Sequence, residues 1–299
     1  MSENDSLDGE AVGAVGDIGT DRDMAMLPVA VIMSVYKNDR YERLAVALDS
    51  LIDQVGIAPG MVRIYLGIDG PVSSDIKRVI DERMSHIYKL LAFDKNRGLH
   101  FILNDLILVL EKEQFIFRMD SDDFSYPERI VRQLAYLRDH EDIDVVGTGV
   151  REVHDDCRFY HVPANRAVGV ENFYQRMPVA HPTVCYRRHV IDTVGGYPEV
   201  PFNEDIAMWI ECYKRGYKFG NVDECLLDFT IDGSFWKRRS YRKAFIEFST
   251  HTRGIWTLEG VTWKYIVPLM RMTFKLMPES VKRWGYTSSA FRNVSADGR

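Results

Sequence analysis

Residues 29–35 read VAVIMSV, a continuous apolar run rich in β-branched side chains. Such a run is typical of a strand that is buried on both faces, as in a parallel sheet covered by helices. Asn38 or Asp39 can cap a helix directly after it. The residues that follow place an apolar stripe on one helix face, at Leu44, Leu48, Leu51 and Ile52. This strand–helix unit predicts an α/β fold.

The alternation of strand and helix continues to about residue 150. Apolar runs predict strands at residues 62–68, 88–93, 114–119 and 143–150. Capping signals and helical spacing predict helices at residues 73–86, 98–110 and 127–140. We therefore expect a mostly parallel sheet with helices on both faces. Beyond residue 150 we expect a helix at 204–215, strand-like pieces at 217–220 and 225–231, and a helical C-terminal tail from about 239.

The charge of the chain is divided unevenly. The 299 residues carry a net charge of −6, which equals the charge of residues 1–27, with seven acids and one base. Residues 233–299 hold thirteen bases and four acids, so residues 28–232 carry nine more acids than bases. This acidic body argues against nucleic acid as a partner, because such binders usually have a basic face. We expect residues 1–27 to be a disordered leader and not a signal peptide, since they lack an apolar stretch.

Composition excludes several other classes of protein. With 46% hydrophobic and 12% aromatic residues the chain is not a disordered protein. The four cysteines form no CxxC pair, which argues against a zinc ribbon or a disulfide scaffold, and free thiols suit a reducing cytosol. The chain contains no run of about 18 uncharged apolar residues, so we expect no membrane-spanning helix. Dinucleotide, P-loop, serine-hydrolase and zincin motifs (GxGxxG, GxxxxGK[ST], GxSxG and HExxH) are also missing.

The clearest chemical signal follows the fourth predicted strand. Asp120, Asp122 and Asp123 place three carboxylates within four residues, at the sheet edge where ligands of α/β proteins bind. Carboxylates this close raise one another's pKa unless a cation lies among them. A hard divalent ion, Mg²⁺ or Mn²⁺, held by one or two carboxylates and by substrate phosphates would remove the repulsion. The alternative is a solvated acidic turn before the helix expected at Pro127.

Other strand ends also carry polar or aromatic side chains. Tyr36 could stack on a base or pack at the rim of the core, and Asp69 could accept hydrogen bonds from a base or ribose or serve the Asp69-Gly70 turn. Arg97 precedes a helix whose N-terminal amides favour an anion, although Asn96 could be an ordinary cap.

Three further groups lie in the second half of the chain. Glu204 and Asp205 open the helix expected there, where they either complement the helix dipole or provide a general base. His181 is either a structural histidine or part of a site. The cluster with Arg238 and Arg239 is either a solvated charge run or a site for diphosphate or anionic lipid.

Taken in order, these motifs resemble glycosyltransferase family 2, in particular the bacterial branch that builds O-antigen, capsule and exopolysaccharide. The resemblance covers about residues 28–253. It depends on nine short motifs in the family's order: VAVIMSVYKN at residues 29–38, DG at 69–70, NRGL at 96–99, DSDD at 120–123 with Pro127, DVVG at 144–147, HPT at 181–183, GGY at 195–197, NED at 203–205 and KRR at 237–239.

The resemblance implies a GT-A fold, a nucleotide-sugar donor (a UDP-sugar as first choice), a divalent metal and inversion at the anomeric carbon. By position, the donor side would hold Tyr36 near the base, Asp69 bonded to it, Arg97 near the base or diphosphate, and Asp120 near the ribose. Asp122, with Asp120, would bind the metal. Asp205 would be the catalytic base with Glu204 beside it, and His181 would line the acceptor side. Arg238 and Arg239 take the place of a QxxRW motif that closes over the diphosphate, although the Gln and Trp of that motif are missing here.

The resemblance also divides the chain and names its partners. Residues 28–150 would bind the nucleotide sugar, residues 151–236 the acceptor, and residues 237–299 would form a basic helical tail. Basic and aromatic residues in 261–286 fit either an anionic membrane surface or a helix packed on the domain, and the resemblance favours the membrane. The acceptor would be a polyprenyl-diphosphate-linked saccharide, reached from the cytoplasm by a peripheral enzyme on the inner face of the membrane. The alternatives are a sugar-nucleotidyltransferase and a non-catalytic nucleotide-sugar-binding scaffold.

Overall fold

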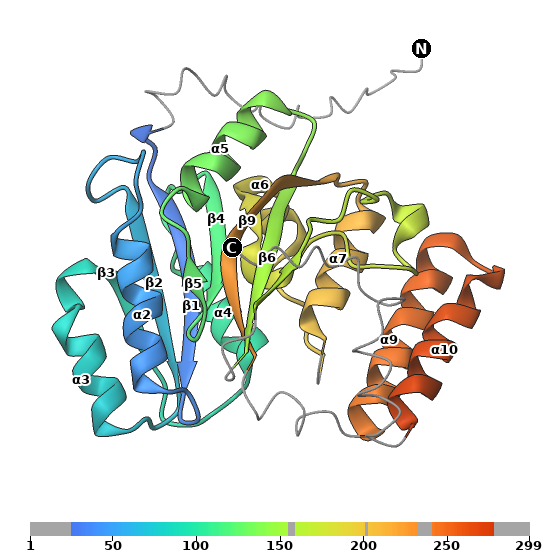
Figure 1. Cartoon of the computed structure of the whole chain (residues 1–299), viewed down its shortest axis with the longest axis horizontal. Coiled ribbons are helices and arrows are strands. Elements are labelled where there is room, and N and C mark those ends of the chain that lie inside the picture. Colours follow the sequence, from blue (N-terminus) through green and yellow to red (C-terminus); the bar gives the residue numbers. More distant parts are fainter. Residues whose placement is uncertain (1–24, 155–158, 201–202, 232–240, 278–299) are drawn as a thin grey trace, which may run out of the picture.

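The computed structural model describes residues 25–154, 159–200, 203–231 and 241–277 (Figure 1). The elements of the first half are β1 (Val29–Tyr36), α2 (Tyr41–Ile52), β2 (Val62–Asp69), α3 (Ser74–Glu82), β3 (Ile87–Ala92), α4 (Leu99–Leu108), β4 (Phe115–Asp120), β5 (Phe124–Ser125), α5 (Arg129–Asp139) and β6 (Val145–His154). Those of the second half are β7 (Phe159–Val162), the short 3-10 turn η3 (His181–Thr183), β8 (Cys185–Arg187), α6 (Arg188–Val194), α7 (Glu204–Lys214), β9 (Phe219–Ile231), α9 (Tyr241–Glu259), η4 (Trp263–Tyr265) and α10 (Ile266–Leu276).

The strands of the described residues form one mixed sheet. Their order is β3-β2-β1-β4-β8-β6-β9-β5, with β7 paired to β6. The first four strands are parallel, whereas β8 runs antiparallel to both β4 and β6. The predicted α/β class is confirmed, and its regular strand–helix alternation corresponds to the parallel half of the sheet.

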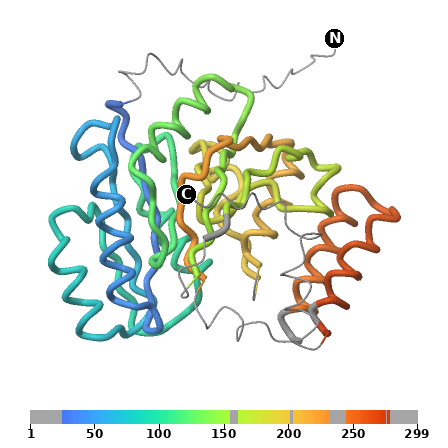
Figure 2. The backbone as a smooth tube through the Cα atoms, in the orientation of Figure 1, coloured from blue at the N-terminus to red at the C-terminus, as the bar shows by residue number. Residues whose placement is uncertain are grey.

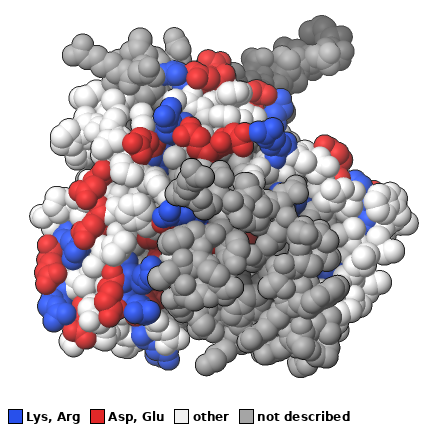
Figure 3. All heavy atoms as spheres, viewed as in Figure 1, with Lys and Arg blue, Asp and Glu red and all other residues white. Residues whose placement is uncertain are grey.

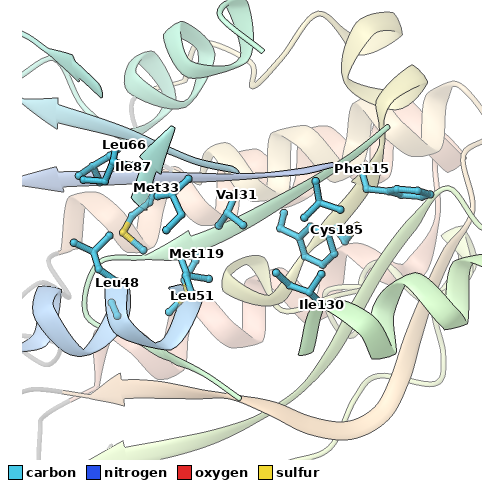
Figure 4. Packing of buried hydrophobic residues seen from close by; sticks show 14 of the residues in the cluster. Val31, Met33, Leu48, Leu51, Leu66, Ile87, Phe115, Met119, Ile130 and Cys185 are labelled. Atoms are coloured by element: carbon cyan, nitrogen blue, oxygen red, sulfur yellow. The ribbon is translucent and has the colours of Figure 1, made fainter. Parts of the chain in front are cut away.

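Both faces of the sheet are covered, because β1 sends its side chains alternately to two cores. Val31 and Met33 point to a core that contains residues of α2, α3 and α5, and Figure 4 shows part of this packing. Ala30 and Ile32 point to the other core, which contains residues of α4, α6 and α7. All four of these side chains are fully buried. The apolar run at residues 29–35 is therefore the centre of both cores, as its composition predicts.

One long strand replaces the two pieces that we expected after residue 215. β9 continues from Phe219 to Ile231, and its register against β6 shifts between Val222 and Cys225. The polar pair Asp223 and Glu224 lies exposed in that bulge and interrupts the apolar pattern without ending the strand. The helix expected from Pro127 begins two residues later, at Arg129.

The C-terminal helices form an antiparallel pair at the side of the molecule away from α2 and α3 (Figure 2). α9 packs on α7 at Gly254, where an added Cβ would lie 2.6 Å from Ile210 Cδ1. Within the expected tail, the described part of the chain is helical at α9 and at α10, which ends at Leu276. Of the leader expected at residues 1–27, only residues 25–27 belong to the described part of the chain. No helix in the described ranges is long and apolar enough to cross a membrane.

Candidate active site

The carboxyl ends of β1, β2 and β4 meet at one edge of the sheet. Strand register places Tyr36 directly beside Asp69 and brings Asp120 next to β1 two residues before Tyr36. Asp39 joins two of these ends, because its Oδ2 accepts hydrogen bonds from the Tyr36 backbone N–H at 3.0 Å and from Ser121 Oγ at 2.7 Å. Three residues predicted to bind the donor are therefore neighbours.

The Asp69 carboxylate organises the loop that leads into α4. It is 3% exposed and accepts hydrogen bonds from the backbone N–H groups of Arg97 and Gly98, at 2.7 and 2.9 Å, and from Asn96 Nδ2 at 2.8 Å. Gly70 allows this contact, since it has a φ of +84° and an added Cβ would lie 2.6 Å from the Asn96 backbone nitrogen. The Asp69 carboxylate therefore bonds the loop before α4 and not its own turn, and its contact with a base stays a prediction.

The Arg97 side chain lies along α4. Its guanidinium forms an ion pair with Asp105 and lies 4.2 Å from the centre of the Phe93 ring. A contact of Arg97 with a donor base or diphosphate stays a prediction, and it would compete with the ion pair to Asp105.

We expect Asp69→Ala to lower the free energy of unfolding by about 3 kcal/mol, because two partly buried backbone N–H groups and an amide lose a charged acceptor. Urea unfolding followed by circular dichroism measures this loss. Asp81→Ala, at an exposed carboxylate of α3, is the matched control. A loss for Asp69→Ala no larger than for the control would contradict the structural role.

The carboxylates after β4 have three different environments. Asp120 is 30% exposed. Its two carboxylate oxygens accept hydrogen bonds from both terminal nitrogens of Arg118, one of them at 2.6 Å. Asp123 is 1% exposed and accepts a hydrogen bond from the Thr230 backbone N–H at 3.0 Å, while its Oδ2 has no hydrogen-bond partner among the described residues. Burial raises the pKa of Asp123 well above its ordinary value, and the charges of Asp120 and Asp122 raise it further. The repulsion expected from the sequence is therefore present.

These oxygens fit a hard cation only in part. The unpartnered Oδ2 of Asp123 and the crowding of Asp120 and Asp122 agree with a cation close to the cluster. No group of three or more His, Cys, Asp or Glu side chains within the described ranges could hold a metal ion by itself. The donor set thus fits Mg²⁺ or Mn²⁺ held by one or two carboxylates and completed by phosphate oxygens of a substrate.

Asp205 lies in the first turn of α7 and is half-buried. Burial raises its pKa to about 6, with a further contribution from the charge of Glu204, whereas the positive charge of Arg118 acts in the opposite direction. The residue before this pair, Asn203, has a φ of +62° and a buried Nδ2 without a hydrogen-bond partner in the described chain. Asparagine adopts this left-handed conformation more readily than other non-glycine residues, so Asn203 suits the turn into α7.

The environment of His181 favours its neutral imidazole. Burial lowers its pKa well below the ordinary value, and the nearby charge of Arg118 adds to the effect. Its Nε2 shares a hydrogen bond of 3.0 Å with Tyr197 Oη, and its ring meets Trp209 of α7 edge-on. Asn104 of α4 holds Tyr197 through both backbone groups. The role of His181 on the acceptor side stays a prediction.

Arg118 is paired with Asp120 and acts by its charge on Asp205 of α7, and the sequence reasoning did not assign it a role. Its side chain is 3% exposed and is paired with Asp120, and its charge lowers the pKa values of Asp205 and His181. Its Nε has no hydrogen-bond partner within the described residues. The signal was available in FIFRMD, where Arg118 lies among apolar residues two positions before the terminal Asp120. The two arginines proposed for the diphosphate, Arg238 and Arg239, lie outside the described residues.

The fold is that of GT-A glycosyltransferases. The structure of Staphylococcus aureus TarS residues 1–349 in complex with UDP-GlcNAc superposes with a TM-score of 0.59, at 16% identity and covering 86% of this chain and 83% of that one. The mannosyltransferase PcManGT from Pyrobaculum calidifontis, in complex with GDP-Man and Mn²⁺, gives a TM-score of 0.57 at 12% identity, covering 89% and 80%.

Residues 30–194 match the model of the family described as glycosyl transferase family 2, and the chain belongs to that family. An Escherichia coli UDP-Gal:alpha-D-GlcNAc-diphosphoundecaprenol beta-1,3-galactosyltransferase is 26% identical over 264 residues, which cover 86% of this chain and 94% of the relative. The amylovoran biosynthesis glycosyltransferase AmsE of Erwinia amylovora is 28% identical over 204 residues, 66% of this chain and 74% of the relative. The family and the fold expected from the sequence are confirmed.

Proposed function

We propose that this protein transfers one sugar from a nucleotide-diphosphate sugar, a UDP-sugar as first choice, to a lipid-linked saccharide in surface polysaccharide synthesis. Residues 28–150 would hold the donor and residues 151–236 the acceptor. The E. coli relative supports this choice, since its name gives UDP-Gal as donor and a saccharide diphosphoundecaprenol as acceptor. On this proposal the enzyme works in the cytoplasm, at the inner face of the membrane where such acceptors are used.

The position and pKa of Asp205 carry the proposal. Asp205 lies in the first turn of α7, and the positive charge of Arg118 lowers its pKa. Arg118 is itself paired with Asp120 at the sheet edge proposed to bind the donor. A carboxylate whose pKa is about 6 is ionised at pH 7 and still basic enough to take a proton from an acceptor hydroxyl. Attack of that hydroxyl opposite the leaving diphosphate is a single displacement, which inverts the anomeric carbon.

The donor would be held at the strand ends. Tyr36 would lie against the base, the loop that Asp69 orders would lie beside it, and Asp120 would face the ribose. Asp122, with Asp120, would hold the divalent ion, which when bound neutralises diphosphate charge and stabilises the leaving nucleoside diphosphate. Arg238 and Arg239 are proposed to contact the diphosphate from the other side.

A donor screen tests this function. The purified protein is incubated with individual nucleotide sugars and a synthetic lipid-diphosphate sugar, with Mg²⁺ or Mn²⁺, and the products are identified by mass spectrometry. We expect one elongated lipid product together with a nucleoside diphosphate. Release of inorganic pyrophosphate would instead support a sugar-nucleotidyltransferase, and donor binding without transfer to any acceptor would support a non-catalytic scaffold.

The pH dependence of the reaction should reflect the raised pKa of Asp205. Since only the ionised carboxylate can accept a proton, we expect kcat/KM to fall below about pH 6, by about tenfold per pH unit, and to level off above it. Initial rates between pH 4.5 and 8 at saturating metal measure this profile, with circular dichroism confirming the folded state at each pH.

Arg118 supplies an internal check on this profile. Its positive charge lowers the pKa of Asp205, so Arg118→Met should move the acid limb to higher pH, whereas Arg118→Lys should keep it near the original position. An acid limb that stays in place in Arg118→Met would show that the limb belongs to another group.

A further inference from the structure

The outward face of α10 is apolar. Its exposed residues recur at helical spacing, and Thr273 is the one polar residue among those described; the others are Ile266, Leu269, Met270 and Leu276. Ile266 is 52% exposed and Met270 is 63% exposed. A helix on the surface of a domain normally turns such a stripe toward the core. An apolar stripe that faces outward therefore indicates a surface that binds a partner.

Arg271 of α10 and Lys264 of η4 point the other way. Arg271 donates a hydrogen bond to the Gln175 carbonyl oxygen, and Lys264 bonds to the Glu171 carbonyl oxygen and to Glu259. These contacts attach α10 and η4 to the domain. The apolar side chains therefore face outward because the polar ones are used for docking, and the orientation of the helix is set by specific hydrogen bonds.

The apolar surface extends over the turn between α9 and α10. Val261 is 85% exposed, Trp263 is 69% exposed and Trp256, on the outer side of α9, is 62% exposed. In Figure 3 the surface over this hairpin, at the right of the view, is mostly white, whereas blue and red residues are mixed over α2 and α3 at the left. Large aromatic side chains beside an apolar stripe are typical of surfaces that lie in the membrane interface.

The charge around this face indicates which kind of partner it binds. Among the described residues the outward stripe of α10 has no acidic side chain, and Arg253 lies exposed on α9 between Ser249 and Trp256. The sequence on both sides of the hairpin is basic, with KRR at 237–239 before it and four bases against two acids at 278–299 after it. The exposed Arg253 and the net positive charge of the neighbouring sequence favour anionic lipid headgroups as the partner of this face.

We propose that the outward face of α10, together with the exposed aromatic residues of the α9–α10 turn, docks this enzyme on an anionic bilayer. With eleven residues, α10 is about 16 Å long, too short to span and suited to lie along the interface. The proposal rests on the proposed function in one respect: a lipid-linked acceptor would present its sugar next to the surface on which the enzyme docks.

Vesicle binding tests the proposal. Full-length protein is mixed with vesicles of phosphatidylcholine and phosphatidylglycerol in about a 70:30 ratio, or of phosphatidylcholine alone, and bound protein is separated by flotation. We expect binding to the anionic vesicles that weakens with salt. The triple variant Ile266→Ser, Leu269→Ser and Met270→Ser should lower the partition coefficient at least about tenfold, because it removes three large apolar side chains from the interface.

The matched control replaces exposed apolar residues elsewhere, Val46→Ser in α2 and Leu108→Ser in α4, and should bind as the wild type does. The proposal is overturned if the wild type does not float, if the triple variant floats equally well, or if the control loses binding to the same extent. It is also overturned if the wild type binds only after removal of residues 278–299, or if sedimentation shows a dimer that the triple variant loses, since these results assign another cover to the face.

Donor turnover measured without vesicles separates this proposal from the proposed function. Transfer to a water-soluble acceptor that persists while vesicle binding is missing would reject the docking surface alone. Vesicle binding by a protein that turns over no nucleotide sugar would leave the surface in place and reject the transferase mechanism.

Discussion

Asp122→Ala is expected to reduce kcat by on the order of a hundredfold to a thousandfold. Loss of several kcal/mol of metal-assisted stabilisation of the leaving diphosphate corresponds to this range, at about 1.4 kcal/mol per tenfold. The fold should be retained, because the Asp122 carbonyl oxygen that accepts the Thr230 hydroxyl at 2.6 Å belongs to the backbone. Turnover as a function of Mn²⁺ or Mg²⁺ concentration, together with a thermal melt, measures both effects.

A binding measurement makes this test independent of activity. Titration calorimetry of Mn²⁺ in the presence of UDP should show weaker binding for Asp122→Ala than for the wild type. Asp81→Ala, in α3, should bind Mn²⁺ and turn over the donor as the wild type does. Full activity of Asp122→Ala in the presence of a chelator would remove the metal from the mechanism.

Asp205→Asn should lower kcat by roughly a hundredfold to ten-thousandfold while the dissociation constant of the donor stays within about twofold. The amide has nearly the shape of the carboxylate but cannot accept the proton of the attacking hydroxyl. The acid limb of the pH profile should disappear with it, because the group with the pKa of about 6 is gone. Single-turnover rates and donor binding by calorimetry separate chemistry from binding.

Glu204→Gln is the matched control for the base. Glu204 is the neighbouring carboxylate in the first turn of α7 and raises the pKa of Asp205 by its charge. The Glu204→Gln variant should therefore have its acid limb at lower pH and should retain most of the wild-type kcat. An unchanged rate in Asp205→Asn combined with a large loss in Glu204→Gln would transfer the role of base to Glu204.

Much of the parallel half of the fold could be predicted, because its signals are local. The run at residues 29–35 is apolar on both sides of the strand, and the structure uses both sides in two cores. β9 was predicted as two pieces because Asp223 and Glu224 look like a turn when only neighbours in sequence are considered. The long pairing with β6 keeps this strand continuous through a bulge.

The parts of the candidate site that could be predicted are the residues whose location follows from their position at the end of a strand. Tyr36, Asp69 and Asp120 end neighbouring parallel strands, so their meeting follows from the order of strands and helices. The loop contacts of Asp69 and the pairing of Asp120 with Arg118 could not be predicted, since each depends on how a side chain is oriented once the strands are paired.

The sequence by itself thus determined the family, the buried strands and the edge of the sheet where the carboxylates gather, because periodicity and residue order are properties of neighbours along the chain. The tertiary structure alone decided the rest. It brought the charge of Arg118 to act on Asp120 and on Asp205, 85 residues apart, and buried Asp205 enough to raise its pKa to about 6. It also turned the apolar side of α10 outward. Burial and electric fields depend on distance in space, and these distances exist only after the chain has folded.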